Sequence, residues 1–354
     1  MQKILYLGMD VHQACIVIVV LDATGKTISE AIIETKTETV RDFIRGLRGE
    51  LHVTLEESAQ AAWLYDLLRP LATEVLVCNP RHNKLLGAGN KSDRIDALKL
   101  AQLLRAGLLK PVYHGESGTR ALKEMVRSYE CLVSDTTRVM NRIKAIYRAR
   151  GVACAGHDVY REDRRAEWLA KLTERGVRLR AGVLYRQLTA LKELSAEAKQ
   201  AMLAESGKHG ARKLLAGVPK LGAVRVAQIL ASVDTPHRFR SKRQFWAYCG
   251  LAVVTRASAE YRIEDGRVKK AAKAQATRGL NGNYNHRLKS VFKSAAQSAC
   301  ASEPFKHQYD ALLAQGTTAA LARLTVTRKL AAITLALWKR GEPFDAERAV
   351  QRAA

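Results

Sequence analysis

Residues 4–22 read ILYLGMDVHQACIVIVVLD, two β-branched apolar runs joined by a short polar break. Runs of this kind predict two consecutive strands, and TISEAIIET (27–35) predicts a third after a turn-like segment. One residue interrupts the apolar pattern: Asp10 lies inside the first run, where a solvated charge has no ordinary role. The sequence therefore opens with three antiparallel strands, of which the first carries an acid.

Helices and strands alternate over the rest of the first 110 residues. Helical spacing in 37–50 is followed by a strand at 52–58, a helix at 61–71 and a buried strand at 74–80. A last helix is predicted at 94–107, with Ser92 as its N-cap and Gly107 near its end. The order β-β-β-α-β-α-β-α is that of a ribonuclease-H-like α/β domain, in which the first and fourth strands are neighbours.

Four acidic residues fall on the elements that such a domain brings together. Asp10 and Glu56 lie on the first and fourth strands, and Asp93 and Asp96 are one helical turn apart on the last helix. Four converging carboxylates repel one another unless a cation is present. Oxygen ligands suit Mg²⁺ or Mn²⁺, and a metal pair about 4 Å apart supports phosphoryl transfer. The sequence therefore predicts a divalent-metal site formed by these four acids.

Ordinary structural roles exist for each acid taken singly. Asp10 is also compatible with a strand-end turn, and Asp93 or Asp96 with an acid that favours the positive end of a helix. Glu57, directly after Glu56, is a competing candidate for the fourth-strand ligand.

Positive charge is the strongest feature of the composition, and it is unevenly distributed. The chain has 59 Lys+Arg against 34 Asp+Glu, but residues 1–110 hold 14 against 13, residues 111–215 hold 21 against 12, and residues 216–354 hold 24 against 9. A basic surface attracts polyphosphate. A ribosome-like or merely soluble basic protein is the alternative, but a nearly neutral domain followed by a basic remainder favours chemistry in one part and nucleic-acid binding in the other.

Other compositional signals exclude several classes of protein. No apolar run approaches the ~20 residues of a membrane span, and the start lacks the pattern of a signal peptide. The six cysteines are far apart and form no CxxC pair, so reduced buried thiols are favoured over a zinc or redox motif. We expect a cytoplasmic, nucleoid-associated protein.

Two long amphipathic helices are predicted in the middle of the chain, at 117–150 and 181–205. They suggest an antiparallel helical arm or a dimerising coiled coil. Their apolar stripes are formed by Leu122, Val126, Tyr129, Val133, Val139 and Ile143, and by Leu184, Leu188, Leu191, Leu194 and Leu203. We therefore expect an α/β domain at 1–112, a helical arm at 113–210 and a mostly α basic domain at 211–354.

The segment 213–235 reads as helix, tight turn, helix. Its turn, GVPKLG (217–222), resembles a helix-hairpin-helix, in which N–H groups at the start of the second helix receive a DNA phosphate. Lys220 stands where such motifs usually carry a glycine, and an ordinary helix junction is the alternative. With Arg225, Lys220 is a candidate for contact with DNA.

Four short motifs match one family in the right order: GMDVH (8–12), LEES (55–58), VCNP (77–80) and KSDRIDA (91–97). The chain resembles the DEDD transposases of the insertion-sequence-110 group and the related Piv DNA invertases. The stretches 217–230 and 239–258 resemble the C-terminal transposase domain of that family. The resemblance implies a RuvC-like N-terminal domain with Asp10, Glu56, Asp93 and Asp96 as the metal-binding tetrad.

The resemblance also implies a nucleophilic serine in the C-terminal domain, and Ser258 matches it. Ala257, Ala259 and Val253 depart from the usual pattern around that serine. The family further implies that a structured RNA from the element guides DNA choice. Basic residues of the same region, Arg256, Lys269 and Lys270, are candidates for steadying the phosphate charge or binding nucleic acid.

Three functions remain open from the sequence. The first is a transposase or recombinase that joins DNA through Ser258, working as a dimer or tetramer. The second is a RuvC-type structure-selective endonuclease that uses metal-activated water. The third is a non-catalytic nucleic-acid-binding protein.

Overall fold

The computed structural model describes residues 3–80, 92–115, 119–258, 261–264, 267–270 and 275–347. It divides into two compact units, an N-terminal unit, Met1–Glu116, and a C-terminal unit, Ser117–Ala354. Among the described residues, no helix combines the length and apolarity that crossing a bilayer requires.

The N-terminal unit is built on a five-stranded mixed sheet with strand order β3-β2-β1-β4-β5. β1 pairs antiparallel with β2 and parallel with β4, as the sequence predicted for the first and fourth strands. Its elements are β1 (Ile4–Val11), β2 (Cys15–Asp22), β3 (Thr27–Glu34), α1 (Thr37–Gly46), β4 (Glu50–Glu56), α2 (Ala61–Leu68), β5 (Glu74–Cys78) and α3 (Asp93–Arg105).

Two apolar layers cover the sheet because alternate strand residues point to opposite faces. Leu7 and Met9 lie in the core shared with α1 and α2, whereas Val17 and Val19 pack against α3. Helix α3 begins where the sequence predicted, since the Ser92 hydroxyl accepts the Ile95 N–H at 3.3 Å. The first residues of α3 are thereby fixed beside the sheet.

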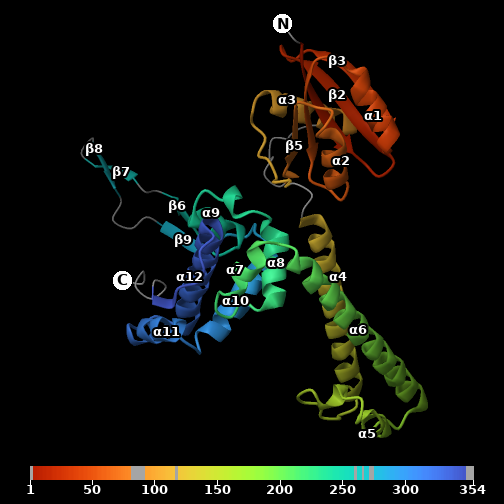
Figure 1. The fold of residues 1–354 in the computed structure, drawn as a ribbon, viewed down its shortest axis with the longest axis vertical. Helices are drawn as coiled ribbons and strands as arrows, with labels where there is room; N and C mark the ends of the chain where they lie inside the picture. Colours follow the sequence, from red (N-terminus) through yellow and green to blue (C-terminus); the bar gives the residue numbers. More distant parts are fainter. Residues whose placement is uncertain are drawn as a thin grey trace. The chain divides into compact units, whose positions relative to one another are not determined.

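The C-terminal unit is mostly helical and begins with two long helices that lie side by side (Figure 1). Its helices are α4 (Arg120–Arg148), α5 (Arg165–Ala170), α6 (Arg175–Gly207), α7 (Ala211–Ala216), α8 (Ala223–Val233), α9 (Lys242–Tyr248), α10 (His286–Ala299), α11 (Phe305–Ala314) and α12 (Ala319–Arg340). The two long helices predicted at 117–150 and 181–205 correspond to α4 and α6.

The apolar stripe of this pair is split between two cores. Val139 and Leu188 belong to a core at the α5 end, with the Tyr147 and Tyr185 hydroxyls 3.1 Å apart inside it. Leu122 instead lies in the core that α4 shares with α8, α10 and α12. Between these cores, two residues of the predicted stripe, Val133 and Leu194, are 40% and 48% exposed.

Four short strands interrupt the helices in a region that the sequence indicated to be irregular. β6 (Val253–Ser258) pairs antiparallel with β9 (Gln275–Leu280), and β7 (Tyr261–Glu264) pairs with β8 (Arg267–Lys270). The strands were missed because they are short and mix basic, polar and apolar residues, and apolar residues such as Val253, Ile263 and Val268 are exposed instead of forming a buried face.

Candidate active site

Asp10 and Glu56 are brought together by the parallel pairing of β1 with β4. Met9 is the register partner of Leu55, so Asp10 and Glu56 occupy the next step of the same ladder. Both acids follow a residue that is fully buried, Met9 or Leu55. The two strands therefore place both carboxylates at one edge of the core, where each side chain is only partly exposed.

Helix α3 approaches this edge at unusually short range, and Gly8 permits the approach. A Cβ atom at Gly8 would lie 2.1 Å from the Ala97 carbonyl oxygen and 2.5 Å from the Ala101 nitrogen. Arg94 adds a bidentate ion pair from α3 to Glu30 on β3, at 2.5 and 2.7 Å. The first turn of α3, which carries Asp93 and Asp96, is thereby held against β1.

The electrostatics show that the four acids share one environment. Burial raises the pKa of Asp10, and the charges of Asp93 and Asp96 raise it further, against a lowering by His12. Burial also raises the pKa of Glu56, assisted by the charges of Asp10 and Asp96. Asp10 thus interacts with each of the other three acids predicted from the sequence, and the ligand atoms of Asp10, Asp93 and His12 come within 4.8 Å of one another.

Two observations test whether these residues suit a divalent cation. The Oδ1 atom of Asp96 is buried and has no hydrogen-bond partner among the described residues. Carboxylate oxygens of Asp10 and Asp93 also lie, with a His12 ring nitrogen, within 4.8 Å of one another. An orphaned buried oxygen and mutually repelling hard ligands are what a bound Mg²⁺ or Mn²⁺ ion would satisfy. The residues fit the cation.

The structure separates Glu56 from its neighbour Glu57. The Glu57 carboxylate contacts the His114 Nε2 atom at 2.7 Å and is 43% exposed, whereas the pKa of Glu56 is raised by burial and by the charges of Asp10 and Asp96. Alternation along a strand explains the difference, since consecutive side chains point to opposite faces. Glu56 is therefore the fourth-strand acid of the cluster.

One member of the cluster, His12, was missed from the sequence. Its Nε2 atom lies 3.2 Å from Asp10 Oδ2 and 3.4 Å from Asp93 Oδ2. The available signal was the i, i+2 spacing from Asp10, which places both residues on the same side of extended backbone.

Ser258 lies in the C-terminal unit, as the last residue of β6, and its register partner on β9 is Gln275. Arg256 lies two residues earlier on the same strand, opposite Thr277. Lys269 and Lys270 lie on β8, opposite Arg262 and Tyr261 respectively, and the Lys269 side chain is exposed. Ala259, beside Ser258, and Lys91 of the KSDRIDA motif lie outside the described residues.

The base of the β6–β9 ribbon is anchored to two helices. Trp246 on α9 donates its indole N–H to the Arg328 carbonyl at 2.9 Å, and Arg328 on α12 donates Nε to the Leu251 carbonyl at 2.6 Å. At the end of β9, the Asn281 N–H donates to the Ala252 carbonyl at 3.2 Å. The two ends of the ribbon thus meet at a fixed point.

The predicted hairpin is present between α7 and α8, and its lysine has a glycine-like backbone. Lys220 has φ +64°, in the left-handed region, and its side chain is exposed. Gly222 precedes α8 without a side-chain cap, which leaves N–H groups of the first turn without helical partners. Arg225 donates to the Lys220 carbonyl at 2.9 Å and to Ser294 Oγ at 3.2 Å. Its guanidinium therefore braces the turn.

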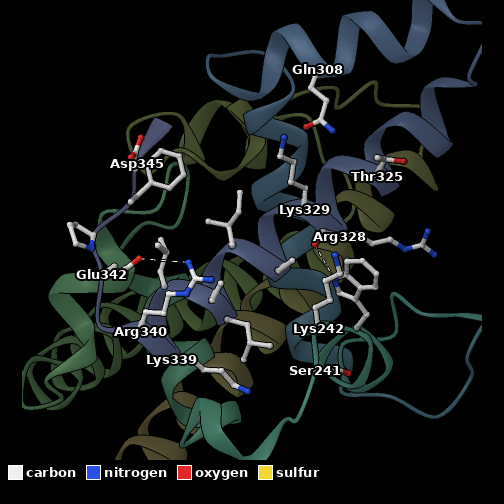
Figure 2. Close-up of a pocket in the computed structure, with 18 of the residues that line it drawn as sticks. Ser241, Lys242, Gln308, Thr325, Arg328, Lys329, Lys339, Arg340, Glu342 and Asp345 are labelled. Atoms are coloured by element: carbon white, nitrogen blue, oxygen red, sulfur yellow. Dashed lines mark hydrogen bonds and ion pairs between the residues drawn. The ribbon is translucent and has the colours of Figure 1, made fainter. Parts of the chain in front are cut away.

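A basic pocket of 850 Å³ lies in the C-terminal unit between α9, α11, α12 and the segment after α12 (Figure 2). Burial lowers the pKa of Lys329, whose side chain points toward Gln308 in Figure 2. The basic residues of the pocket are Arg240, Lys242, Arg328, Lys329, Lys339 and Arg340, against the acidic Glu342 and Asp345. Such an excess of cations favours an anionic ligand.

Two transposase family models match this chain, one in each half. A transposase family model of the DEDD, IS110 type matches residues 7–148, and the model of the IS116/IS110/IS902 transposase family matches residues 212–310. The first range contains the acid cluster, and the second contains the hairpin and the β6–β9 ribbon.

Two curated relatives are similar over parts of their length. The transposase for insertion sequence element IS1533 of Leptospira borgpetersenii is 29% identical over 153 residues, which are 40% of this chain and 43% of the relative. The transposase for element IS1111A of Coxiella burnetii (strain RSA 493 / Nine Mile phase I) is 23% identical over 257 residues, 71% of this chain and 69% of the relative. Since the two family models match residues 7–148 and 212–310, and the curated relatives are transposases, the chain belongs to the IS110 family of transposases.

Proposed function

We propose that this protein is a DNA transposase that cleaves and rejoins DNA strands with a divalent metal and a serine nucleophile. The observation that carries the proposal is the convergence of Asp10, Glu56, Asp93 and Asp96 at one edge of the sheet. The strand order supports the assignment of the N-terminal unit as a ribonuclease-H-like domain of the RuvC type. The family of the chain supports DNA as the substrate.

The four acids would hold Mg²⁺ or Mn²⁺. When bound, the metal supplies Lewis-acid polarisation of the scissile phosphate and stabilises the charge of the leaving oxygen. The chain's own contribution is to hold four oxygen donors in a fixed arrangement, through the β1–β4 register and the close docking of α3 at Gly8. Orientation by rigid elements is what makes such a site effective.

We assign the nucleophile to Ser258. Its Oγ attacks the phosphorus, an O–P bond to the protein forms, the P–O bond to one strand breaks, and the serine proton leaves to a base or water as the departing oxygen is protonated. A strand hydroxyl later attacks the phosphoserine, which restores Ser258 and joins the DNA. A free hydroxyl is a poor nucleophile near neutral pH. Attack by the Ser258 hydroxyl would therefore require a general base or a metal ion to activate it.

The C-terminal unit would hold the nucleic acid. The hairpin presents Lys220 and unpartnered N–H groups at the start of α8, a combination that suits a phosphate. The basic pocket adds a cationic surface of the same unit. We extend the proposal to a structured guide RNA from the same element and to a dimer or tetramer, both carried over from the family resemblance.

A trapping experiment tests the mechanism. Purified protein is incubated with Mn²⁺ and labelled DNA that carries the ends of its element, then denatured and separated from free DNA. We expect a covalent protein–DNA adduct whose attachment maps to Ser258. The Ser258→Ala variant should lose the adduct and strand joining. If Ser258→Ala still cuts as well as the unmodified protein, the site works as a hydrolytic nuclease and the serine assignment is wrong.

The acid cluster has its own variant and a matched control. Asp10→Asn should lower cleavage more than about 100-fold, because loss of even an outer-sphere partner of a metal typically costs 10- to 100-fold. Asp42→Asn removes an exposed acid of α1 in the same unit and should leave cleavage unchanged. Equal activity of the two variants would sink the metal-site proposal.

A further inference from the structure

The position of His12 beside the acids is fixed by its backbone. The His12 N–H donates to the Cys15 carbonyl at 2.9 Å, and its carbonyl accepts the Thr35 hydroxyl at 2.9 Å. The residue directly follows β1, two positions after Asp10, so both side chains leave the same face. The ring is consequently placed at the acid cluster by the sheet and the turn that follows.

The His12 ring lies between two acids that belong to the proposed metal site. Its Nε2 atom is 3.2 Å from Asp10 Oδ2 and 3.4 Å from Asp93 Oδ2, and the three ligand atoms lie within 4.8 Å of one another. A nitrogen that lies close to two carboxylate oxygens in this way is placed to act as a third ligand to one metal ion bound by those oxygens.

The other histidines that the structure describes in the N-terminal unit, His52 and His114, differ in their surroundings. His52 contacts Glu74 through Nδ1 at 2.8 Å and Glu50 through Nε2 at 3.3 Å, and His114 contacts Glu57 at 2.7 Å. Those glutamates lie outside the four-acid cluster. An ion pair of this kind at the surface typically contributes little, and His12 and Asp93 are 46% and 60% exposed. A contribution of this ion pair to the stability of the fold therefore does not explain why a histidine occupies position 12.

The four acids also divide into two sets that share Asp10. Asp10 and Asp93 are the pair in contact with His12, whereas Glu56 interacts with Asp10 and Asp96. The first set offers two oxygens and a nitrogen, and the second offers oxygens only. The cluster is thus chemically asymmetric, with its nitrogen donor at the Asp93 side.

We infer that His12 is a metal ligand, together with Asp10 and Asp93, and that it gives this half of the site a preference for Mn²⁺ over Mg²⁺. Mg²⁺ demands oxygen donors and retains its waters, whereas imidazole suits first-row transition metals. The inference rests on the proposed function, because it takes the acid cluster to be a metal site.

The test measures metal binding directly, on the full chain freed of metal by a chelator. Mn²⁺ is added to protein labelled with ¹⁵N-histidine, and pulsed electron paramagnetic resonance detects nitrogen coupled to the bound ion. We expect one imidazole coupling in the unmodified protein and its loss in His12→Gln, which keeps an oxygen donor. Titration calorimetry should show that His12→Gln lowers the Mn²⁺ over Mg²⁺ preference about 10-fold or more, the scale of changes in a metal's surroundings.

Two further variants interpret the result. His157→Ala, an exposed histidine of the C-terminal unit, should retain the coupling. Asp10→Asn should lose Mn²⁺ binding together with the coupling. Bound Mn²⁺ without imidazole coupling in the unmodified protein would overturn the role of His12 and leave the four-acid site standing. Failure of the unmodified protein to bind Mn²⁺ above the Asp10→Asn background would overturn the metal site and the proposed function with it.

Discussion

The two units of the chain carry their functional groups in opposite ways. In the N-terminal unit, side chains from β1, β4 and α3 converge on one point, and Gly8 leaves no space for an additional atom. In the C-terminal unit, exposed cations such as Lys220 and Lys269 are spread over a hairpin and a ribbon. Convergent sites depend on geometry and distributed surfaces on total charge. Apart from the proposed nucleophile Ser258, single changes should therefore be severe at the acid cluster of the first unit and mild among the exposed cations of the second.

The largest effect is expected from Gly8→Ala, which tests whether the cluster depends on the docking of α3. The added methyl would overlap the Ala97 carbonyl at 2.1 Å, so α3 must move away from β1 and take Asp93 and Asp96 with it. Overpacking of this kind costs about 1–3 kcal/mol or more. Thermal unfolding should show that loss, and Mn²⁺ should no longer raise the unfolding temperature.

Gly46→Ala is the matched control. Gly46 is the last residue of α1, and nothing lies within 4 Å of a Cβ built there. Alanine is the better helix former by roughly 1 kcal/mol, so the variant should keep or slightly gain stability and bind metal normally. If both glycine variants behave alike, close packing of α3 is not what holds the acids together.

A smaller effect should appear in the pH dependence of the metal-free protein. The pKa values of Asp10 and Glu56 are raised, so the folded state binds protons more tightly than the unfolded chain. Their stabilising contribution is complete below the unfolded values, near 3.8 and 4.5, and is lost as the pH rises through the raised folded values. Lowering the pH from 7 to 5 in a chelator should therefore raise the unfolding temperature of the N-terminal unit.

The raised pKa values fix the sign of this change, an increase in unfolding temperature as the pH falls. Asp10→Asn should raise the unfolding temperature at pH 7 in the chelator, because it removes a negative charge that is repelled by the neighbouring carboxylates. The same variant should flatten the pH dependence of the unfolding temperature. Scanning calorimetry with and without Mn²⁺ checks both. A decrease in stability from pH 7 to 5 in the chelator would contradict the repulsion within the cluster.

The smallest effect is expected in the C-terminal unit, from Lys220→Gly. Glycine adopts φ +64° freely, whereas a left-handed backbone costs other residues about 1–2 kcal/mol, so the variant should keep or gain stability. Removing one phosphate contact should weaken DNA binding for all sequences and reduce the salt dependence by about one counterion. Fluorescence anisotropy at several salt concentrations measures both.

Lys220→Arg keeps the charge and the strained backbone, so it separates the two effects. It should bind DNA like the unmodified protein. A loss of affinity greater than about 100-fold in Lys220→Gly would show that binding converges on this residue, and the contrast between the two units would then fail.

Local signals predicted the N-terminal unit well because its elements are fixed by short-range chemistry. The Ser92 cap, the apolar runs of β1 and β2 and the strand of Glu56 each follow from a few neighbouring residues. The pairing of β1 with β4, which brings Asp10 near Glu56, also followed from the sequence, because the order of elements restricts which strands can pair.

The remainder depended on contacts between distant residues. Nothing near Val133 or Leu194 indicates that the α4–α6 stripe is interrupted between two cores, because that division depends on residues from α8 to α12. The left-handed backbone of Lys220 is supported by Arg225; the hairpin resemblance placed Lys220 at a usual glycine position, but a lysine does not by itself indicate such a backbone. His12 was overlooked because a histidine after a strand has many ordinary roles.

The anchored base of the β6–β9 ribbon makes that ribbon a separable insertion in the helical core. Its two ends meet at the hydrogen bond between Ala252 and Asn281. Trp246 and Arg328, which lie on helices outside the ribbon, fix the chain just before β6 through their hydrogen bonds. A tight two-residue connection can bridge ends this close. Replacing the segment that carries Ser258 by such a connection should therefore leave the packing of the helices beneath it unchanged.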